Sequence, residues 1–177
     1  MRKILTILIA VISIQTFGQI PTDPATKKFI YEAVVGADSI KGDAIYNNAK
    51  EWLSRNLKSS DNNISFDKDS KTMTTTGNIH LENRVGWCEH KDINLNFKFS
   101  VFVKDGRYKY IVENFYVSYY NVCGLGSNSP ISEPFEELDF GNKQKEKVYN
   151  EADTKVKGMI SELEKYIKSP TSAKKDW

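Results

Sequence analysis

Two long arms of alternating residues, joined by an Asp-Gly pair, constrain the fold of this chain more than any other feature. Residues 92–104 place an apolar side chain at every second position, so one side of this strand must be buried. Asp105-Gly106 is the strongest short-range hairpin signal, because a type I′ turn needs positive φ at both central residues. The chain is therefore predicted to turn back into a second strand that ends near Tyr120. The apolar residues of the first arm are Ile93, Leu95, Phe97, Phe99, Val101 and Val103.

The turn also fixes which residues of the two arms lie opposite each other. Lys98 falls opposite Glu113, which is a favourable cross-strand charge pair. One pairing fits poorly, since Asn114 falls opposite the apolar Phe97. In this register the apolar face of the first arm meets Tyr108, Tyr110, Val112 and Tyr116.

The remaining segments complete an α+β fold. Aromatic and β-branched residues predict a first strand over 27–35, and residues 62–67 and 71–82 predict two more strands. Apolar residues at helical spacing predict helices over 42–57, anchored by Trp52, and over 143–168. The expected architecture is a mostly antiparallel sheet of about five strands packed against helices, in the order strand, helix, four strands, helix. Residues 121–141 have no clear periodicity and read as a long loop, and residues 169–177 as a flexible tail.

The N-terminus has the pattern of a secretory signal peptide. A basic pair, Arg2-Lys3, precedes the apolar run Ile4–Ile14, and Thr16-Phe17-Gly18 supplies a cleavage site. A membrane-spanning helix needs about 20 apolar residues, and this run is much shorter. We therefore expect residues 1–18 to be removed and residues 19–168 to form one exported globular domain without a membrane span. Its destination is the periplasm, the outer-membrane surface or the medium.

Charge argues against a nucleic-acid partner. The chain has 25 Lys and Arg residues and 23 Asp and Glu residues, and two of the basic residues, Arg2 and Lys3, belong to the export signal. The mature chain is therefore formally neutral, whereas a nucleic-acid binder carries a basic face that neutralises phosphates.

The hairpin register brings the two cysteines, Cys88 and Cys123, directly opposite each other. Opposed residues of an antiparallel pair have Cα atoms about 4.5 to 5.5 Å apart, which is within reach of a disulfide. Export to an oxidising compartment favours one bridge. The alternatives are two free thiols, or a reactive Cys88 beside His90, and a single β-bulge in these arms would spoil the register.

No constellation of residues in the sequence predicts a catalytic, metal or cofactor site. Cys88-Glu89-His90, with His80 upstream, is the only cluster that resembles one, and its spacing matches no zinc pattern or known nucleophile arrangement. Gly124-Leu-Gly-Ser-Asn-Ser lacks the helix that should follow a phosphate-binding loop. We accordingly keep a hydrolase that uses Cys88 or His90 only as an alternative function. A structural subunit of an envelope assembly is a further alternative.

The end of the second arm is apolar on both faces. Phe115 and Tyr119 lie on the face opposite Tyr116 and Tyr120 in the predicted register. Either the chain's own helix or long loop covers the second face, or a groove there accepts an apolar or planar ligand or a partner protein. Phe115, Tyr119 and Tyr120 are the candidate contact residues for an unknown envelope protein or such a ligand.

Several segments of the chain, taken together, form a recognisable pattern. They are Ile20-Pro21, Phe29-Ile-Tyr31, Val34-Val35, Tyr46-x-x-Ala49-Lys50-Glu51-Trp52, Gly77-x-Ile79 and Val103-Lys-Asp-Gly-Arg-Tyr108. This pattern resembles a family of exported bacterial proteins, a domain of unknown function numbered 4468 and described as having a fold like the TATA-binding protein. The resemblance covers about residues 29–120, of which the hairpin and the Ala-Lys-Glu-Trp helix are the more specific parts. Gly36-Ala37-Asp38-Ser39 stands where the family has a Pro-Gly turn, and neither the cysteine pair nor the closing helix belongs to the motif.

The resemblance implies architecture and no activity: a curved antiparallel sheet packed on helices, with no catalytic residue to transfer. Together with the export signal, it leads us to expect a non-enzymatic envelope or secreted binding module, without cofactor or nucleic-acid partner.

Overall fold

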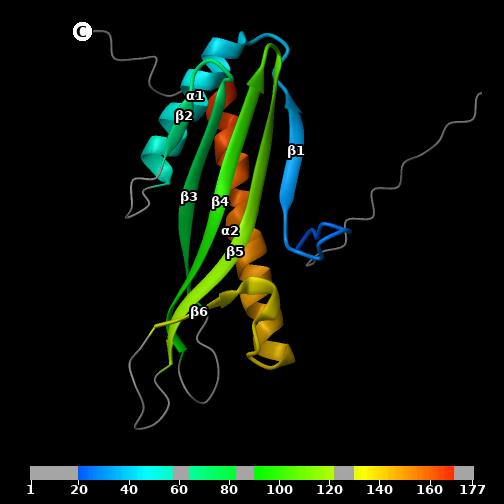
Figure 1. Cartoon of the computed structure of the whole chain (residues 1–177), viewed down its shortest axis with the longest axis vertical. Helices are drawn as coiled ribbons and strands as arrows, with labels where there is room; N and C mark the ends of the chain where they lie inside the picture. The colour runs from blue at the N-terminus through cyan, green and yellow to red at the C-terminus, as the bar shows by residue number, and fades with distance from the viewer. Residues whose placement is uncertain (1–19, 58–63, 83–89, 122–129, 170–177) are drawn as a thin grey trace, which may run out of the picture.

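The computed structural model describes residues 20–57, 64–82, 90–121 and 130–169, and side chains are not described at residues 90–92 and 121. These residues form an antiparallel sheet with two helices behind it (Figure 1). The strands lie side by side in the order β1-β5-β4-β3-β2, and β6 pairs with the far end of β5. In chain order the elements are β1 Tyr31–Gly36, α1 Gly42–Asn56, β2 Ser65–Asp67, β3 Thr72–Leu81, β4 His90–Lys104, β5 Arg107–Asn121, β6 Pro130–Pro134, the 3-10 helix Phe135–Glu137 and α2 Asn142–Lys168.

This architecture confirms the predicted α+β fold, with β6 as an additional strand. The helix ends agree with the sequence pattern to within one residue, and Trp52 of α1 is buried against Phe99 of β4, with ring centroids 6.4 Å apart. β1 starts at Tyr31 and not at Lys27, because Asp23 turns the preceding segment: its backbone exchanges hydrogen bonds with Lys27 and Lys28. No helix within the described residues is long and apolar enough to cross a membrane.

The core lies between the sheet and the two helices. Alternate residues of β4 are at most 5% exposed, as their pattern predicts, and the apolar stripes of both helices pack against them. From α1 and α2 the buried apolar residues are Ile45, Tyr46, Ala49, Trp52, Leu53, Val148, Ala152, Val156, Ile160, Leu163 and Ile167. The helices therefore cover one face of the sheet.

The hairpin forms where the sequence predicts it, but its turn differs from the expected one. Lys104 pairs with Arg107 across the two-residue loop, and Lys98 pairs with Glu113 as predicted. Of the two loop residues only Gly106 has a positive φ, at 70°, so the turn is not type I′. Asp105 instead turns its carboxylate toward α1, where Oδ1 accepts the Gly42 N–H at 2.8 Å.

A bulge in β5 corrects the predicted register. Pairing shifts by one residue between Asn96 and Lys98, where Asn114 adopts a φ of 55°. The extra residue turns the rest of β5 over, because successive side chains of a strand point to opposite faces. Tyr116, predicted on the core face, is therefore 45% exposed, and Phe115 is 2% exposed.

The predicted loop 121–141 contains more structure than its sequence suggested. β6 pairs with β5 from Tyr116↔Pro134 to Tyr120↔Pro130, and a 3-10 helix follows it. Pro130 and Pro134 stand at the two ends of β6, which pairs with β5, at positions where a missing N–H is tolerated.

Candidate functional site

Within the described residues, one face of the sheet has no helix over it. Figure 1 looks onto this face, and the strands pass in front of α2. We call it the open face. Its side chains, assigned from strand pairing and burial, are Glu32 and Val34 on β1, Thr72, Thr74, Thr76, Asn78 and His80 on β3, the even-numbered residues Asn94–Lys104 on β4, and Arg107, Lys109, Ile111, Glu113, Tyr116, Ser118 and Tyr120 on β5.

The large apolar side chains that the described structure leaves exposed all lie on this face. Two are at the hairpin end, Val34 at 64% and Phe102 at 39% exposure. The other two, Tyr116 at 45% and Tyr120 at 43%, lie on the second half of β5. Exposed apolar side chains that are scattered over a surface need no explanation, whereas several on one face indicate a contact site. The open face is therefore the candidate contact surface.

A groove of about 400 Å³ lies at the hairpin end of the open face. Val34 and Phe102 line it, and Lys109 lies between them because it pairs with Val34 on β1 and with Phe102 on β4. Lys104 and Arg107 line the same groove, and its described lining contains no Asp or Glu. This hairpin-end groove therefore combines two exposed apolar side chains with three cations.

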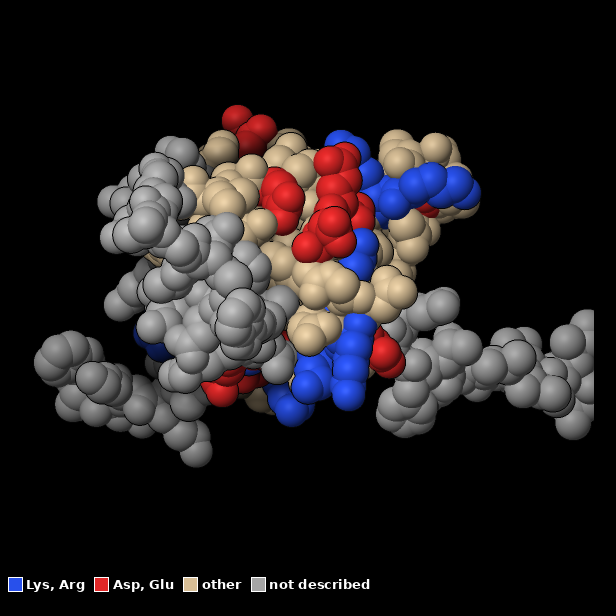
Figure 2. Space-filling view, turned by 90° about the horizontal axis from the view of Figure 1, so that it is seen from below, with Lys and Arg blue, Asp and Glu red and all other residues tan. Residues whose placement is uncertain are grey.

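Figure 2 shows the opposite end of the molecule, where charge is distributed differently. There Asp and Glu residues lie next to Lys and Arg residues among uncharged ones. Among the described residues in that view, positive and negative side chains mix, which contrasts with the single sign of charge that lines the hairpin-end groove.

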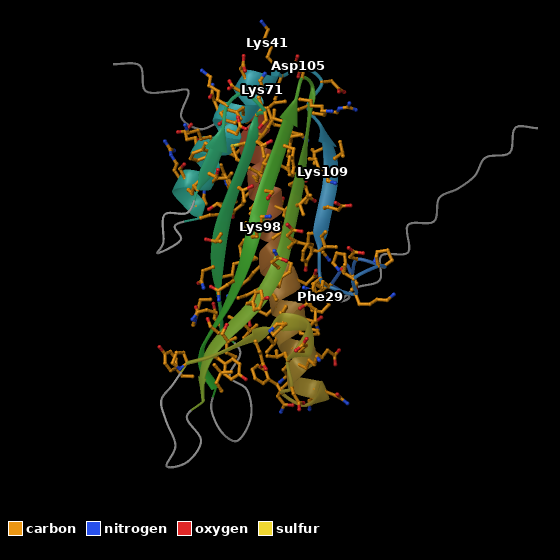
Figure 3. The ribbon with its side chains drawn as sticks, viewed as in Figure 1. Phe29, Lys41, Lys71, Lys98, Asp105 and Lys109 are labelled. Carbon is orange, nitrogen blue, oxygen red and sulfur yellow. The ribbon has the colours of Figure 1, made fainter. Side chains whose placement is uncertain are left out.

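Polar side chains connect the strands across the middle of the open face. Asn78 Nδ2 donates to Asn96 Oδ1 at 2.8 Å, and Asn96 Nδ2 donates to Ser118 Oγ at 3.1 Å, so one chain of hydrogen bonds spans β3, β4 and β5. Lys98 Nζ lies 3.3 Å from Glu113 Oε1, and Figure 3 places Lys98 near the middle of the sheet. These bonds order the side chains in the middle of the open face.

The candidate contact residues from the sequence separate into two groups. Phe115 is buried between Tyr31 and Phe97, with ring centroids at 5.8 and 6.0 Å. Tyr119 is 7% exposed, because Phe140 from the connection before α2 covers it with ring centroids 5.1 Å apart. Tyr120 alone of the three is exposed on the open face. Phe115 and Tyr119 are thus covered from within the chain, Phe115 by rings of β1 and β4 and Tyr119 by Phe140.

A smaller groove of about 280 Å³ borders Phe115. It lies at the edge of β5 away from β4, between the part that pairs with β1 and the part that pairs with β6. It is lined on one side by Asn114, Phe115 and Tyr116 and on the other by Lys27 and Glu136 among others. Beside this groove, Glu136 Oε1 accepts the Phe29 N–H at 2.8 Å, which joins the segment before β1 to the 3-10 helix.

A cavity larger than either groove lies away from the open face. It measures about 640 Å³ and lies between residues 21–32 and α2. At its wall the Tyr31 hydroxyl donates to Asp153 Oδ1 at 2.9 Å, and Lys157 Nζ lies 2.8 Å from Asp153 Oδ2. Burial, with the Asp153 carboxylate beside it, raises the pKa of Tyr31 far above its usual value. The phenol therefore stays protonated and serves as a hydrogen-bond donor that joins β1 to α2.

The predicted cysteine and histidine cluster falls mostly outside the described residues. Cys88 and Cys123 are not described, and His90 is described only in its backbone. His80 is exposed on the open face, with Nδ1 3.4 Å from Asn94 Oδ1. Within the described ranges, no group of three or more His, Cys, Asp or Glu side chains could hold a metal ion.

Comparison with solved structures finds the same fold. A TBP-like protein from Parabacteroides distasonis ATCC 8503 matches with a TM-score of 0.67 at 13% identity, over 85% of this chain and 97% of that one. A DUF4468 family protein from Bacteroides ovatus ATCC 8483 matches with a TM-score of 0.62, also at 13% identity, over 85% of this chain and 92% of that one. No curated protein matches the chain.

The family assignment comes from the sequence. Residues 31–118, which run from β1 to the second half of β5, match the family model described as "Domain of unknown function (DUF4468) with TBP-like fold". The segment includes three of the four exposed apolar side chains of the open face, Val34, Phe102 and Tyr116. Through the domain that residues 31–118 form, the chain belongs to the DUF4468 family.

Proposed function

We propose that this protein is an exported binding module that contacts a partner protein through the open face. One observation carries the proposal: Val34, Phe102, Tyr116 and Tyr120, the large apolar side chains left exposed in the described residues, all lie on the face away from the helices. Exposed apolar side chains that share a surface and are surrounded by polar ones are typical of protein contact sites. The hydrogen-bonded ladder from Asn78 to Ser118 lowers the entropic cost of binding, because these side chains are already ordered.

The N-terminal sequence supports export. Residues 1–18 have the charged, apolar and small-residue regions of a signal peptide, and the rest of the chain is formally neutral. Mass spectrometry of the protein from the envelope fraction and the medium of its native host tests this. A first peptide that begins at Gln19 is expected, and recovery of the uncleaved chain from the cytoplasm would contradict export.

Comparative capture from envelope extract tests the contact surface. The bait is the full chain, wild type or with Phe102→Ser and Tyr116→Ser together. The matched control is Lys143→Ser with Lys168→Ser, which changes two exposed positions on α2. A protein that the wild type and the α2 control retain, and that the open-face variant loses, supports the proposal. If all three baits retain the same proteins in the same amounts, the open face is not the contact surface.

A further inference from the structure

We infer that the hairpin-end groove binds an extended acidic segment of a partner protein, in which a carboxylate and an apolar side chain are two residues apart. The inference rests on the proposed function and specifies the chemistry of the partner at one end of the open face. The inference follows from the charge, the apolar side chains and the spacing of the groove.

The charge of the groove is unbalanced in a way that the rest of the open face is not. Lys98 lies opposite Glu113 across β4 and β5, with 3.3 Å between the charged atoms, and Lys109 Nζ lies 2.9 Å from Glu32 Oε2 in the neighbouring row. Lys104 lies directly opposite Arg107, so this row places two positive charges side by side. Neither of these two cations pairs with a carboxylate in the described part of the chain.

Two like charges that face each other across strands are destabilising. The nearby carboxylate of Asp105 makes no ion pair with either cation and is turned toward α1, where its Oδ1 accepts the Gly42 N–H at 2.8 Å. Figure 3 shows Asp105 at the hairpin tip, close to Lys71 and Lys41. A carboxylate from outside the chain, placed between Lys104 and Arg107, would form ion pairs with these two cations, as Glu113 does with Lys98.

The apolar side chains of the groove lie in the next row on the same face. Phe102 precedes Lys104 by two residues on β4, and Val34 lies across Lys109 from it. Residues i and i+2 of a strand are about 7 Å apart. Consider an extended segment that runs along the strand direction and carries an acidic and an apolar residue with one residue between them. When its acidic side chain lies at Lys104 and Arg107, its apolar side chain lies at Phe102.

A short acidic segment fits this surface better than a long polyanion. Among the described side chains of the open face, only the row of Lys104 and Arg107 has unpaired positive charge, whereas Glu32 and Glu113 would meet a longer anion on the same face. Beyond these residues the face offers amide and hydroxyl groups, such as Asn78, Asn96 and Ser118, which suit hydrogen bonds to a polypeptide.

An NMR titration of the ¹⁵N-labelled protein, expressed as the full chain, tests the inference at low salt. The probe is the capped pentapeptide Glu-Gly-Phe-Gly-Glu, and the matched probes are Lys-Gly-Phe-Gly-Lys and Glu-Gly-Ala-Gly-Glu. We expect the first peptide to shift the amide signals of Val34, Phe102, Lys104 and Arg107. The lysine peptide should not bind, the alanine peptide should bind more weakly, and added salt should weaken binding.

Variants of the groove make the test quantitative. Lys104→Glu with Arg107→Glu should weaken binding of the acidic peptide about tenfold, because two ion pairs are lost. The control Lys143→Glu with Lys168→Glu makes the same change in net charge on α2 and should leave the affinity unchanged. Lys104→Glu alone should raise the unfolding midpoint, since it places opposite charges across the strands, and yet reduce binding. This opposite effect on stability and affinity separates loss of binding from loss of fold.

Each alternative result contradicts the inference in a distinguishable way. Shifts confined to Tyr116 and Tyr120 would refute the groove site but leave the open face as the contact surface. Unchanged affinity of the Lys104→Glu, Arg107→Glu variant would show that the two cations do not bind the peptide. Absence of peptide binding, together with charge-dependent sedimentation of the protein with phosphatidylglycerol vesicles, would assign the groove to a membrane surface.

Discussion

The ring of Phe97 on β4 lies directly over Gly77, its cross-strand partner on β3. A Cβ atom at Gly77 would overlap Cε2 and Cζ of this ring, so the contact requires a glycine. On its other side Phe97 meets Phe115, with ring centroids 6.0 Å apart, at the bulge that turns β5 over. The pair therefore lies where the sheet changes register.

Gly77→Ala is expected to destabilise the protein by about 1 to 3 kcal/mol, because the new methyl group forces the buried Phe97 ring to move. Urea unfolding monitored by circular dichroism measures the change. Gly158→Ala in the middle of α2 is the matched control, since a Cβ atom there has nothing within 4 Å. The control should stabilise the protein by up to about 1 kcal/mol, because alanine is the better helix former. Equal stability of the Gly77→Ala variant and the wild type would contradict the packing described.

Asp105→Ala should destabilise the protein by about 0.5 to 2 kcal/mol, the range for loss of a helix N-cap. Lys41, at the N-cap position of α1, makes no capping hydrogen bond with its own side chain, and the hairpin carboxylate takes this role for Gly42. Asp69→Ala removes a carboxylate without a partner in the described structure from the turn between β2 and β3, and its effect should stay within about 0.5 kcal/mol. Thermal unfolding of both variants distinguishes the two cases, and equal midpoints would argue against capping by Asp105.

Stability should fall as the pH rises from 10 to about 12, partly because of Tyr119. Burial, together with the hydrogen bond to Glu133, raises the pKa of Tyr119 from 10.0 to about 12 in the folded state. The stabilisation is therefore complete below pH 10 and is lost as the pH approaches 12, since the unfolded chain releases this proton first. Tyr119→Phe should make the decline less steep, as measured by urea unfolding at pH 9, 10 and 11. An identical pH dependence in wild type and variant would contradict this coupling.

A disulfide between Cys88 and Cys123 remains a prediction, because both residues lie outside the described ranges. Two register shifts between β4 and β5 compensate, so His90 and Asn121 pair in the same register as Lys98 and Glu113. Peptide mapping without reductant should recover one linked peptide that contains both cysteines. Loss of the bridge in Cys88→Ser should cost about 2 to 4 kcal/mol of stability. Alkylation of both thiols in the unreduced native protein would exclude the bridge.

The hairpin illustrates how far sequence reasoning reaches in this chain. Strict alternation over β4 and a turn with Gly106 determine the pairing of Lys98 with Glu113, since both signals are local. The bulge at Asn114 depends on how Phe97 packs against Gly77 and Phe115, which lie on other strands. One local signal of a bulge is the Asn that the uninterrupted register places opposite Phe97. Asn adopts a positive φ more readily than most residues, as the bulge requires.

The open face was not predictable in the same way. Val34 and Phe102 are far apart in the chain and line one groove only because β1 pairs with β5, a pairing that no local pattern encodes. The sequence predicts the aromatic end of β5, but after the bulge its side chains lie on the faces opposite to the predicted ones. Tyr120 is exposed in the structure, whereas Phe115 and Tyr119 are covered from within the chain.

Site-specific photo-crosslinking in the native host tests most directly whether the open face is where this protein meets its partner. A photoreactive phenylalanine analogue replaces Phe102 or Tyr116 in one pair of strains and Lys143 of α2 in a control strain. The proposal predicts the same crosslinked envelope protein from both open-face positions and none from position 143. Crosslinks from Lys143 but from neither open-face position would show that the partner meets the helical side.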